Sequence, residues 1–403
     1  MAGPLTADGM TPLAQILLSS AAAFGILAAG AQAAPAQPRG LESVGTATGA
    51  YLAGRHAQQV DDWTNAAAYM ERALAHDPGN VALLRRTFLL QLGDGRTTQA
   101  VSLARRLADR DPANHLVAVV LAADDLMQGR PAQAAKRMAA VTVDEGLGRY
   151  VAPLVSAWVE VANGRVAEAL AALAPLSATP GFAALHDLQA ALINDLAGQA
   201  EAASALYTKA SDGGASLRVI QLHGNFLERQ GRRDEARAQY ERFRDGAVDP
   251  VLIEPALADL GTTTPKPLIG SPIDGLAEAL FDLSSALHQE GASELALLHG
   301  RVALQLRPDF PLARLMVGDI LSARKRHDEA IAEYRQIGGD RGIRWLGRMR
   351  TADQHIQMKK EEEAVALLEE MAAERPERTD ALMALGALHR AAERFDKAAA
   401  AYD

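Results

Sequence analysis

A small residue recurs along this chain about every 34 residues, and this period constrains the fold more than any other feature of the sequence. Alanines mark it from Ala66 to Ala236 at intervals of 33 to 35 residues, and again from Ala296 to Ala398 at intervals of 34. Twelve residues before each of these alanines lies a second position, and nine of its ten occupants are small. A period of this length is typical of solenoids, in which each repeat contacts only its neighbours. The chain should therefore grow by repetition and not around one central core.

The two small positions fit two helices of one pair. Antiparallel helices approach closely only where no bulky side chain separates their backbones. Charged turn segments fall between the positions, as at 230–235 and 324–329, and a proline twelve residues after the second position can end the second helix. Ala and Leu dominate while aromatic residues make up only 4%, which favours closely packed helices. The first position holds Gly54, Phe88, Ala122, Ala157, Ala191, Gly224, Ser284, Gly318, Ala352 and Gly386, the second holds Ala66, Ala100, Ala134, Ala169, Ala203, Ala236, Ala296, Ala330, Ala364 and Ala398, and the prolines are Pro78, Pro112, Pro308 and Pro376.

These residues resemble the tetratricopeptide repeat (TPR) family, whose unit is a 34-residue helix pair with a small residue, a later alanine, an aromatic residue and a closing proline. The clearest copies are 223–240, 317–334 and 385–402. The resemblance runs from about residue 47 to the end and implies an all-α fold, a TPR-like right-handed α-solenoid of antiparallel helix pairs. The aromatic residue, four after the alanine, should pack against the next pair. Phe88 departs from the pattern, as do copies three to five, which lack the closing proline.

Two interruptions divide the chain. The spacing of the alanines rises to 60 between the sixth and seventh copies, which leaves a proline-containing insert at 251–274. We predict a first array of about six helix pairs at 47–250 and a second array of about four pairs, the last one truncated, at 275–403. The insert is either a spacer between the arrays or a binding loop laid over a groove, because loops of this length are often functional. Since the last copy stops within its second helix, we expect a longer protein.

The N-terminal residues have the composition of a secretory signal. Residues 16–34 are apolar and small, and Ala31-Gln32-Ala33 fits the pattern that signal peptidase cleaves, although no Lys or Arg precedes this run. We interpret 1–34 as a signal peptide and 35–46 as a flexible lead, with an ordinary helix or a retained anchor as alternatives. The run is too short and too rich in alanine for a stable membrane span in the mature chain. This interpretation places the protein in a bacterial periplasm, with the cytoplasm as the alternative.

The sequence shows no constellation of residues that would carry catalysis or bind a metal. Cys is absent, and the ten His are scattered without a ligand spacing such as H-E-x-x-H. Adjacent carboxylates such as Asp61 and Asp62 point to different helix faces and make poor acid–base pairs. We therefore expect no enzyme and no cofactor. A net charge of −9 removes long-range attraction to phosphate backbones, so we expect no nucleic-acid partner either.

The resemblance implies a ligand groove on the concave face formed by the first helix of each pair. We take the facing positions to lie six and three residues before the small residue and one after it. In the last three copies this predicts a partner-binding groove made by Leu312, Leu315, Asp319, Leu346, Met349, Asp353 and Met383, together with Asp380 and Ala387. Leu and Met at such positions accept a helix or an extended peptide, or they simply pack against neighbouring helices. Family members that hold a C-terminal carboxylate use Lys and Asn there, whereas Gln221 and Asn225 of copy six have no Lys partner.

Together these features predict a non-catalytic scaffold that binds a protein or peptide partner in its concave groove, in envelope assembly or secretion. The alternative is a regulatory or substrate-recruiting repeat arm of an enzyme whose catalytic domain lies beyond residue 403. The sequence identifies neither the partner nor the pathway, because one fold serves many functions.

Overall fold

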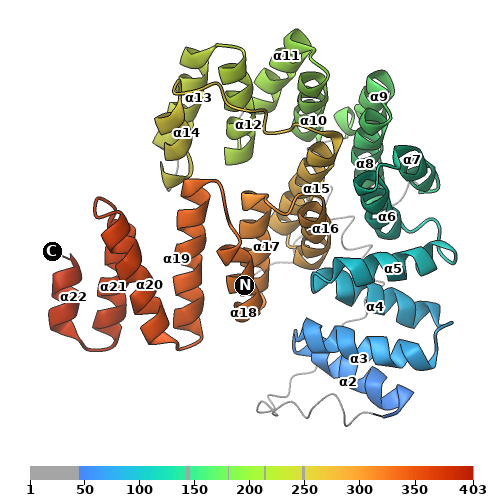
Figure 1. Cartoon of the computed structure of the whole chain (residues 1–403), viewed down its shortest axis with the longest axis horizontal. Coiled ribbons are helices and arrows are strands. Elements are labelled where there is room, and N and C mark those ends of the chain that lie inside the picture. Colours follow the sequence, from blue (N-terminus) through green and yellow to red (C-terminus); the bar gives the residue numbers. More distant parts are fainter. Residues whose placement is uncertain (1–44, 142–145, 180, 213–214, 247–249, 403) are drawn as a thin grey trace, which may run out of the picture. The chain divides into compact units, whose positions relative to one another are not determined.

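The computed structural model describes residues 45–141, 146–179, 181–212, 215–246 and 250–402. These residues form α-helices, one 3-10 helix and no strand (Figure 1). The predicted all-α fold of stacked helix pairs is therefore confirmed. None of the described helices combines the length and the apolar character needed to cross a bilayer. The predicted signal peptide at 1–34 lies outside the described residues, as does most of the lead at 35–46.

Each copy of the repeat is one helix pair. The small position falls in the first helix of every pair and the aligned alanine in the second, where it is at most 4% exposed. The pairs are α2 (Ala47–Gln59) with α3 (Trp63–His76), α4 (Val81–Gly93) with α5 (Thr97–Ala108), α6 (His115–Met127) with α7 (Pro131–Ala139), α8 (Gly148–Ala162) with α9 (Val166–Ser177), α10 (Ala183–Leu196) with α11 (Ala200–Ser211), α12 (Leu217–Arg229) with α13 (Arg233–Gly246), α15 (Pro272–Gln289) with α16 (Ser293–Leu306), α17 (Pro311–Ala323) with α18 (His327–Arg335), α19 (Arg341–Gln357) with α20 (Glu361–Glu374), and α21 (Thr379–Ala391) with α22 (Phe395–Tyr402). Between α13 and α15 lie η3 (Pro250–Leu252) and α14 (Glu254–Asp259).

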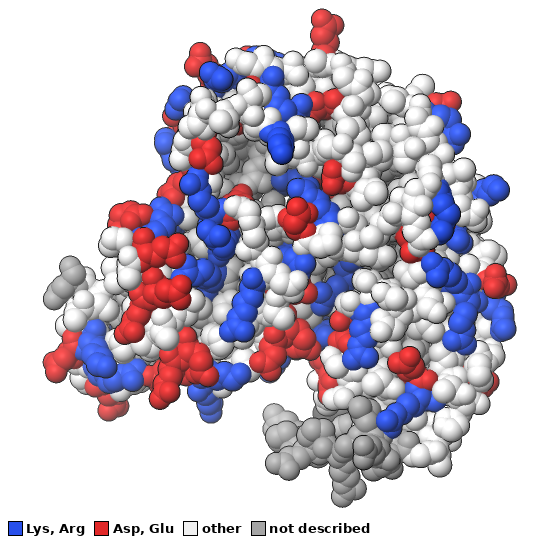
Figure 2. Space-filling view, in the orientation of Figure 1, with Lys and Arg blue, Asp and Glu red and all other residues white. Residues whose placement is uncertain are grey.

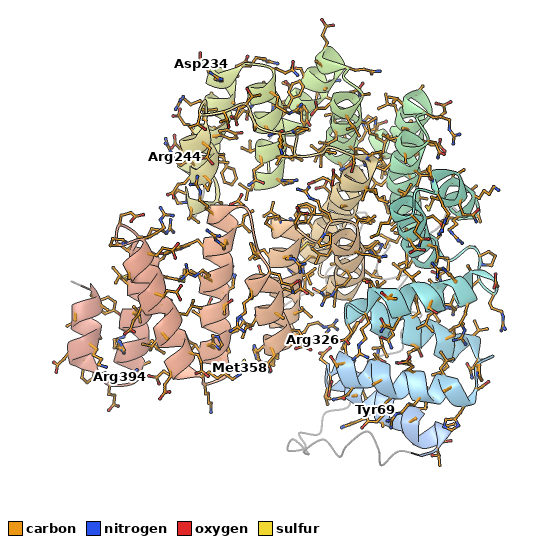
Figure 3. All side chains as sticks on the ribbon, in the orientation of Figure 1. Tyr69, Asp234, Arg244, Arg326, Met358 and Arg394 are labelled. Carbon is orange, nitrogen blue, oxygen red and sulfur yellow. The ribbon has the colours of Figure 1, made fainter. Side chains whose placement is uncertain are left out.

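The turn within each pair has the same conformation in all ten copies. The residue five before the aligned alanine has a φ between 56° and 81°, and it is glycine in six copies and Asp61, Lys325, Lys359 or Glu393 in the others. The next residue donates its backbone N–H to a carbonyl oxygen five residues earlier, as Arg326, labelled in Figure 3, does to Leu321 at 2.9 Å. This left-handed cap closes the first helix and satisfies its last carbonyl groups. A glycine five before the alanine was a signal for this turn that the sequence reasoning missed.

Aromatic rings explain why the first position is small. A Cβ atom on Gly318 would lie 2.3 Å from the Cε1 atom of Tyr334, in the second helix of the same pair. The aromatic residue thus packs on the small residue of its own pair, and Tyr207 also stacks on His223 of the next pair, with ring centroids 5.4 Å apart. Copy two exchanges the sizes, because Phe88 occupies the small position while an alanine, fully buried, occupies the aromatic one.

The helices form two compact units that do not follow chain order. The first unit comprises residues up to 239 together with 263–308, and the second comprises 240–262 together with 309–403. The arrays predicted at 47–250 and 275–403 differ from these units, because the pair α15–α16 packs into the first unit and the insert is shared between both. The pair α15–α16 belongs to the first unit because its apolar side chains are buried there. Leu280, Leu283 and Val302 are fully buried, and α15 and α16 contact α4, α6, α8 and α10.

Candidate functional site

The first unit fills its own groove. The hairpin α15–α16 packs on the first helices of copies two to five and lies inside the arc that these helices form in Figure 1. Trp158 follows the small residue of copy four and so occupies a predicted groove position, where it is fully buried. A Cβ atom on Gly275 of α15 would lie 2.1 Å from the Trp158 ring. The groove is therefore closed over α8 by a helix of the same chain.

A polar network holds α15 in that groove. Arg218 donates two hydrogen bonds to Glu278, from Nε to Oε1 at 2.7 Å and from Nη2 to Oε2 at 2.6 Å, and these side chains are 9% and 0% exposed. Although burial acts against the charge, Glu278 raises the pKa of Arg218. Gln189 accepts from Trp158 Nε1 at 2.7 Å and donates to Asp282 at 2.8 Å. Burial, with the nearby Glu278 carboxylate, raises the pKa of Asp282 well above its ordinary value.

The second half of the insert contacts the same groove as a segment that is neither helix nor strand. Asn225 donates from Nδ2 to the carbonyl oxygen of Lys266 at 2.9 Å and accepts from the backbone N–H of Leu268 at 3.3 Å. Arg307 donates to the Leu268 carbonyl oxygen at 3.4 Å. One amide side chain thus holds both backbone groups of a peptide, as it would hold an extended ligand. Asn225 is occupied by its own chain and not by a foreign carboxylate.

The second unit leaves more of its predicted groove positions uncovered. These positions lie on α17, α19 and α21. Met383 is 57% exposed and Asp353 and Ala387 are exposed, Leu312, Asp319, Leu346, Met349 and Asp380 are half-buried, and Leu315 is buried. Met349 also packs against the core cluster of this unit, which includes Trp345 and Leu368. Some of the predicted groove residues are therefore accessible to a ligand, whereas others, such as Leu315, are buried by packing within the unit.

One arginine brings two of the predicted groove acids together. Arg350 lies 3.3 Å from Asp319 and 4.0 Å from Asp353, measured between its nitrogen atoms and the carboxylate oxygens. Tyr334 donates to Asp319 at 2.7 Å, and burial, with the carboxylate of Asp319, raises the pKa of Tyr334. Sequence reasoning missed Arg350, although its spacing of three residues from Asp353 on one helix was a usable signal. The groove of this unit thus carries acidic groups around one cation.

The first half of the insert closes a cavity of about 340 Å³ beside α19. The backbone of the insert packs directly against the backbone of α19. A Cβ atom on Gly342 would lie 2.1 Å from the carbonyl oxygen of Val251, so only glycine permits this approach. The residues that line the cavity are Glu254, Pro255 and Ala258 of α14, Arg341, Gly342, Arg344, Trp345 and Arg348 of α19, and Glu374 and Arg375 at the end of α20. Sequence reasoning missed this cavity, because α14 of the insert is distant in sequence from the pair α19–α20 that completes it.

Two arginines fix the indole of Trp345, which is 3% exposed. The Cζ atoms of Arg375 and Arg378 lie 5.6 and 5.3 Å from the centroid of the ring, and the indole N–H donates to Asp380 at 2.7 Å. Burial acts against the charge of Asp380, but the hydrogen bonds from Arg378 and Trp345 outweigh it and lower the pKa of this carboxyl. The indole is therefore a rigid part of the cavity wall.

Comparison with known proteins agrees with the repeat at both ends of the chain. The model of the tetratricopeptide repeat family matches residues 51–115 and 352–403. This match supports TPR-like repeats in these two segments. No curated protein sequence matches. The crystal structure of the P58(IPK) TPR domain aligns with 88% of this chain and 91% of that one, at 15% identity and a TM-score of 0.25, a score that carries no information on a shared overall arrangement.

One contact between a serine and a histidine of the described helix pairs resembles part of a catalytic site. Ser211 Oγ lies 2.9 Å from His223 Nδ1, a contact that could suggest a nucleophile and its base. However, burial, with the charge of Arg232, lowers the pKa of His223 to about 4, and Ser211 also donates to the carbonyl oxygen of Tyr207. Across the described ranges, no three His, Cys, Asp or Glu side chains gather as a metal site. On the face shown in Figure 2, basic and acidic side chains are interspersed over the helices.

Proposed function

We propose that this protein is a non-catalytic scaffold that binds a peptide or protein partner on the face formed by α17, α19 and α21. One observation carries the proposal: the groove residues Trp158, Arg218 and Asn225 of the first unit are buried under its own chain, whereas Met383 and Asp353 of the second unit are exposed. TPR repeats generally mediate protein–protein interaction, and the first unit already demonstrates that such a face accepts a helix.

The side chains on this face favour a partner segment that is apolar with a basic residue. Leu346 and Met349 are half-buried and Met383 is exposed, so they offer an adaptable apolar strip. Asp353 is exposed, and among the described residues its one ion-pair contact is with Arg350 at 4.0 Å, which leaves it available to a partner's cation. An amphipathic helix or an extended peptide with Lys or Arg beside Leu or Met side chains would match this pattern.

The place of action that we propose is the bacterial envelope, in assembly or secretion. Its support is the apolar run at 16–34 with the A-x-A pattern at 31–33. Fractionation of cells that express the full coding sequence would test this part separately, since a protein retained in the cytoplasm with its first 34 residues intact would contradict it.

Photo-crosslinking tests the binding face. A photoreactive amino acid at Met383 reports on the groove, and one at Glu362, which is exposed on the second helix of its pair, is the matched control. We expect a discrete partner to be trapped in cells from position 383 and not from position 362. A partner peptide identified in this way should bind the Met383→Glu variant at least tenfold more weakly. Equal trapping at both positions, or none, would contradict the proposal.

A further inference from the structure

We propose that the cavity beside α19 is a second recognition site, which binds a peptide carboxylate together with the apolar side chain next to it. It deepens the proposed function, on which it rests only for the assumption of a peptide or protein partner. Its residues belong to the insert, to the end of α20 and to positions of α19 other than the predicted groove positions Leu346, Met349 and Asp353.

The volume of the cavity and its apolar lining residues suit an apolar side chain. Ligand pockets commonly measure roughly 300 to 1,000 Å³, and a space of about 340 Å³ holds one or two side chains. Pro255, Ala258 and the indole of Trp345 provide apolar lining. Because Trp345 is fixed by its neighbours and buried in the core cluster, this surface is formed before a ligand arrives.

The charges of the lining leave one cation uncommitted. Both lining carboxylates are engaged: Glu254 pairs with Arg375 at 3.2 Å, and Glu374 pairs with Arg348. The side chain of Arg344 is exposed and lines the cavity, and no hydrogen bond or ion pair joins its guanidinium group to any residue that the structure describes. A ligand with negative charge would therefore find a free guanidinium group, whereas a cationic ligand would find no free carboxylate.

A carboxylate suits this site better than a phosphate. The guanidinium group presents two parallel N–H donors that match the two oxygens of a carboxylate. A phosphate with nearly two negative charges would have one free cation and would lie beside Glu254 and Glu374. A carboxylate can come from an Asp or Glu side chain or from the free C-terminus of the partner. Both would place a neighbouring apolar side chain against Pro255, Ala258 and Trp345.

The insert is held in position to form the wall of this site. Asp259 accepts from Arg341 at 2.9 Å, Glu254 from Arg375, and Val251 is fully buried in the core cluster of the unit. Sequence reasoning left open whether the insert is a spacer or a binding loop. Its first half supplies three lining residues of a cavity, which favours a role in binding.

The test is a peptide selection on the full chain. One phage library displays random ten-residue peptides with a free C-terminus, and a second displays the same peptides internally, so the two sources of carboxylate are separated. We expect enrichment of an acidic residue or of a free C-terminus next to an apolar residue. The best peptide should then bind the Arg344→Ala variant about 10- to 100-fold more weakly than the wild type.

Two further variants make the result specific. Arg335→Ala removes another exposed arginine of the same unit, one that no described residue pairs with, and should leave binding unchanged. Ala258→Phe fills the cavity and should abolish binding. Peptides without an acidic or C-terminal requirement, no selected peptide at all, or equal binding to Arg344→Ala would overturn the cavity proposal. Binding lost in Met383→Glu but kept in Arg344→Ala would overturn it while supporting the groove.

Discussion

Replacement of Arg218 by methionine should loosen the hairpin α15–α16 from the groove of the first unit. The change removes hydrogen bonds of 2.7 and 2.6 Å and leaves Glu278, which is 0% exposed, without its cation. Breaking a buried ion pair by removal of one partner costs about 3 to 5 kcal/mol, since the remaining charge is buried and unpaired.

Hydrogen exchange followed by mass spectrometry measures this effect locally. Peptides from 272–306 should exchange through an opening equilibrium that is roughly 100- to 5,000-fold more populated than in the wild type, which is the population equivalent of 3 to 5 kcal/mol. The control is Arg85→Met, whose ion pair with Asp111 at 2.8 Å involves side chains that are 48% and 28% exposed. Such a surface pair contributes about 0 to 1 kcal/mol, so the exchange of the hairpin should hardly change.

The double variant Arg218→Met/Glu278→Met separates charge from packing. An apolar pair of similar volume can replace a buried ion pair at little cost, so most of the lost protection at 272–306 should return. If Arg218→Met alone leaves this exchange within fivefold of the wild type, the ion pair does not hold the hairpin. If the double variant is no better than the single one, the loss comes from packing and the electrostatic reasoning is refuted.

Three further predictions concern the repeat itself. Lys359→Gly should stabilise the protein by about 0.5 to 1 kcal/mol in thermal melts, because Lys359 has a φ of 59°, whereas Lys360→Gly should not. Gly318→Ala should cost about 1 to 3 kcal/mol, since its Cβ would lie 2.3 Å from a buried tyrosine ring, while Gly338→Ala, with no atom within 4 Å, should cost little. Burial lowers the pKa of His299 to about 4, so the stability contributed by its neutral form is fully present above about pH 6.5 and is lost as the pH falls towards 4. Urea unfolding should therefore show a free energy of unfolding about 3 kcal/mol lower at pH 4 than above pH 6.5, and His299→Leu should reduce this dependence on pH.

The sequence was sufficient to predict the helix pairs, because the information that defines them is local. Gly318 and Ala330, twelve residues apart, fall on the two helices of one pair as expected, and each copy repeats that geometry with its neighbours. The exchange of sizes in copy two, with Phe88 at the small position, shows that the pattern specifies total volume and not one residue type.

The placement of α15–α16 could not be predicted from the period, because it depends on contacts between distant residues. Arg218 and Glu278 are 60 positions apart, and Arg301 of α16 donates to the carbonyl oxygen of Gly93, 208 positions earlier, at 3.3 Å. A weak signal did exist, since Glu278 is an acid at a groove position, six residues before the small residue Ser284. The cavity beside α19 escaped prediction for the same reason, as its lining residues on α14 lie about 80 to 120 positions before those on α19 and α20.

The filled groove of the first unit shows what such a face of helix pairs accepts, and the second unit differs from it in charge. In the first unit an arginine of the array, Arg218, meets an acid on the inserted helix. In the second unit the array itself carries the acids, Asp319 and Asp353, and Arg350 lies between them. A second hairpin like α15–α16 would bring its acid against these carboxylates, whereas a helix with a basic residue at that place would complement Asp353. Because like charges disfavour the first arrangement, the second face is suited to a partner different from the chain's own hairpin.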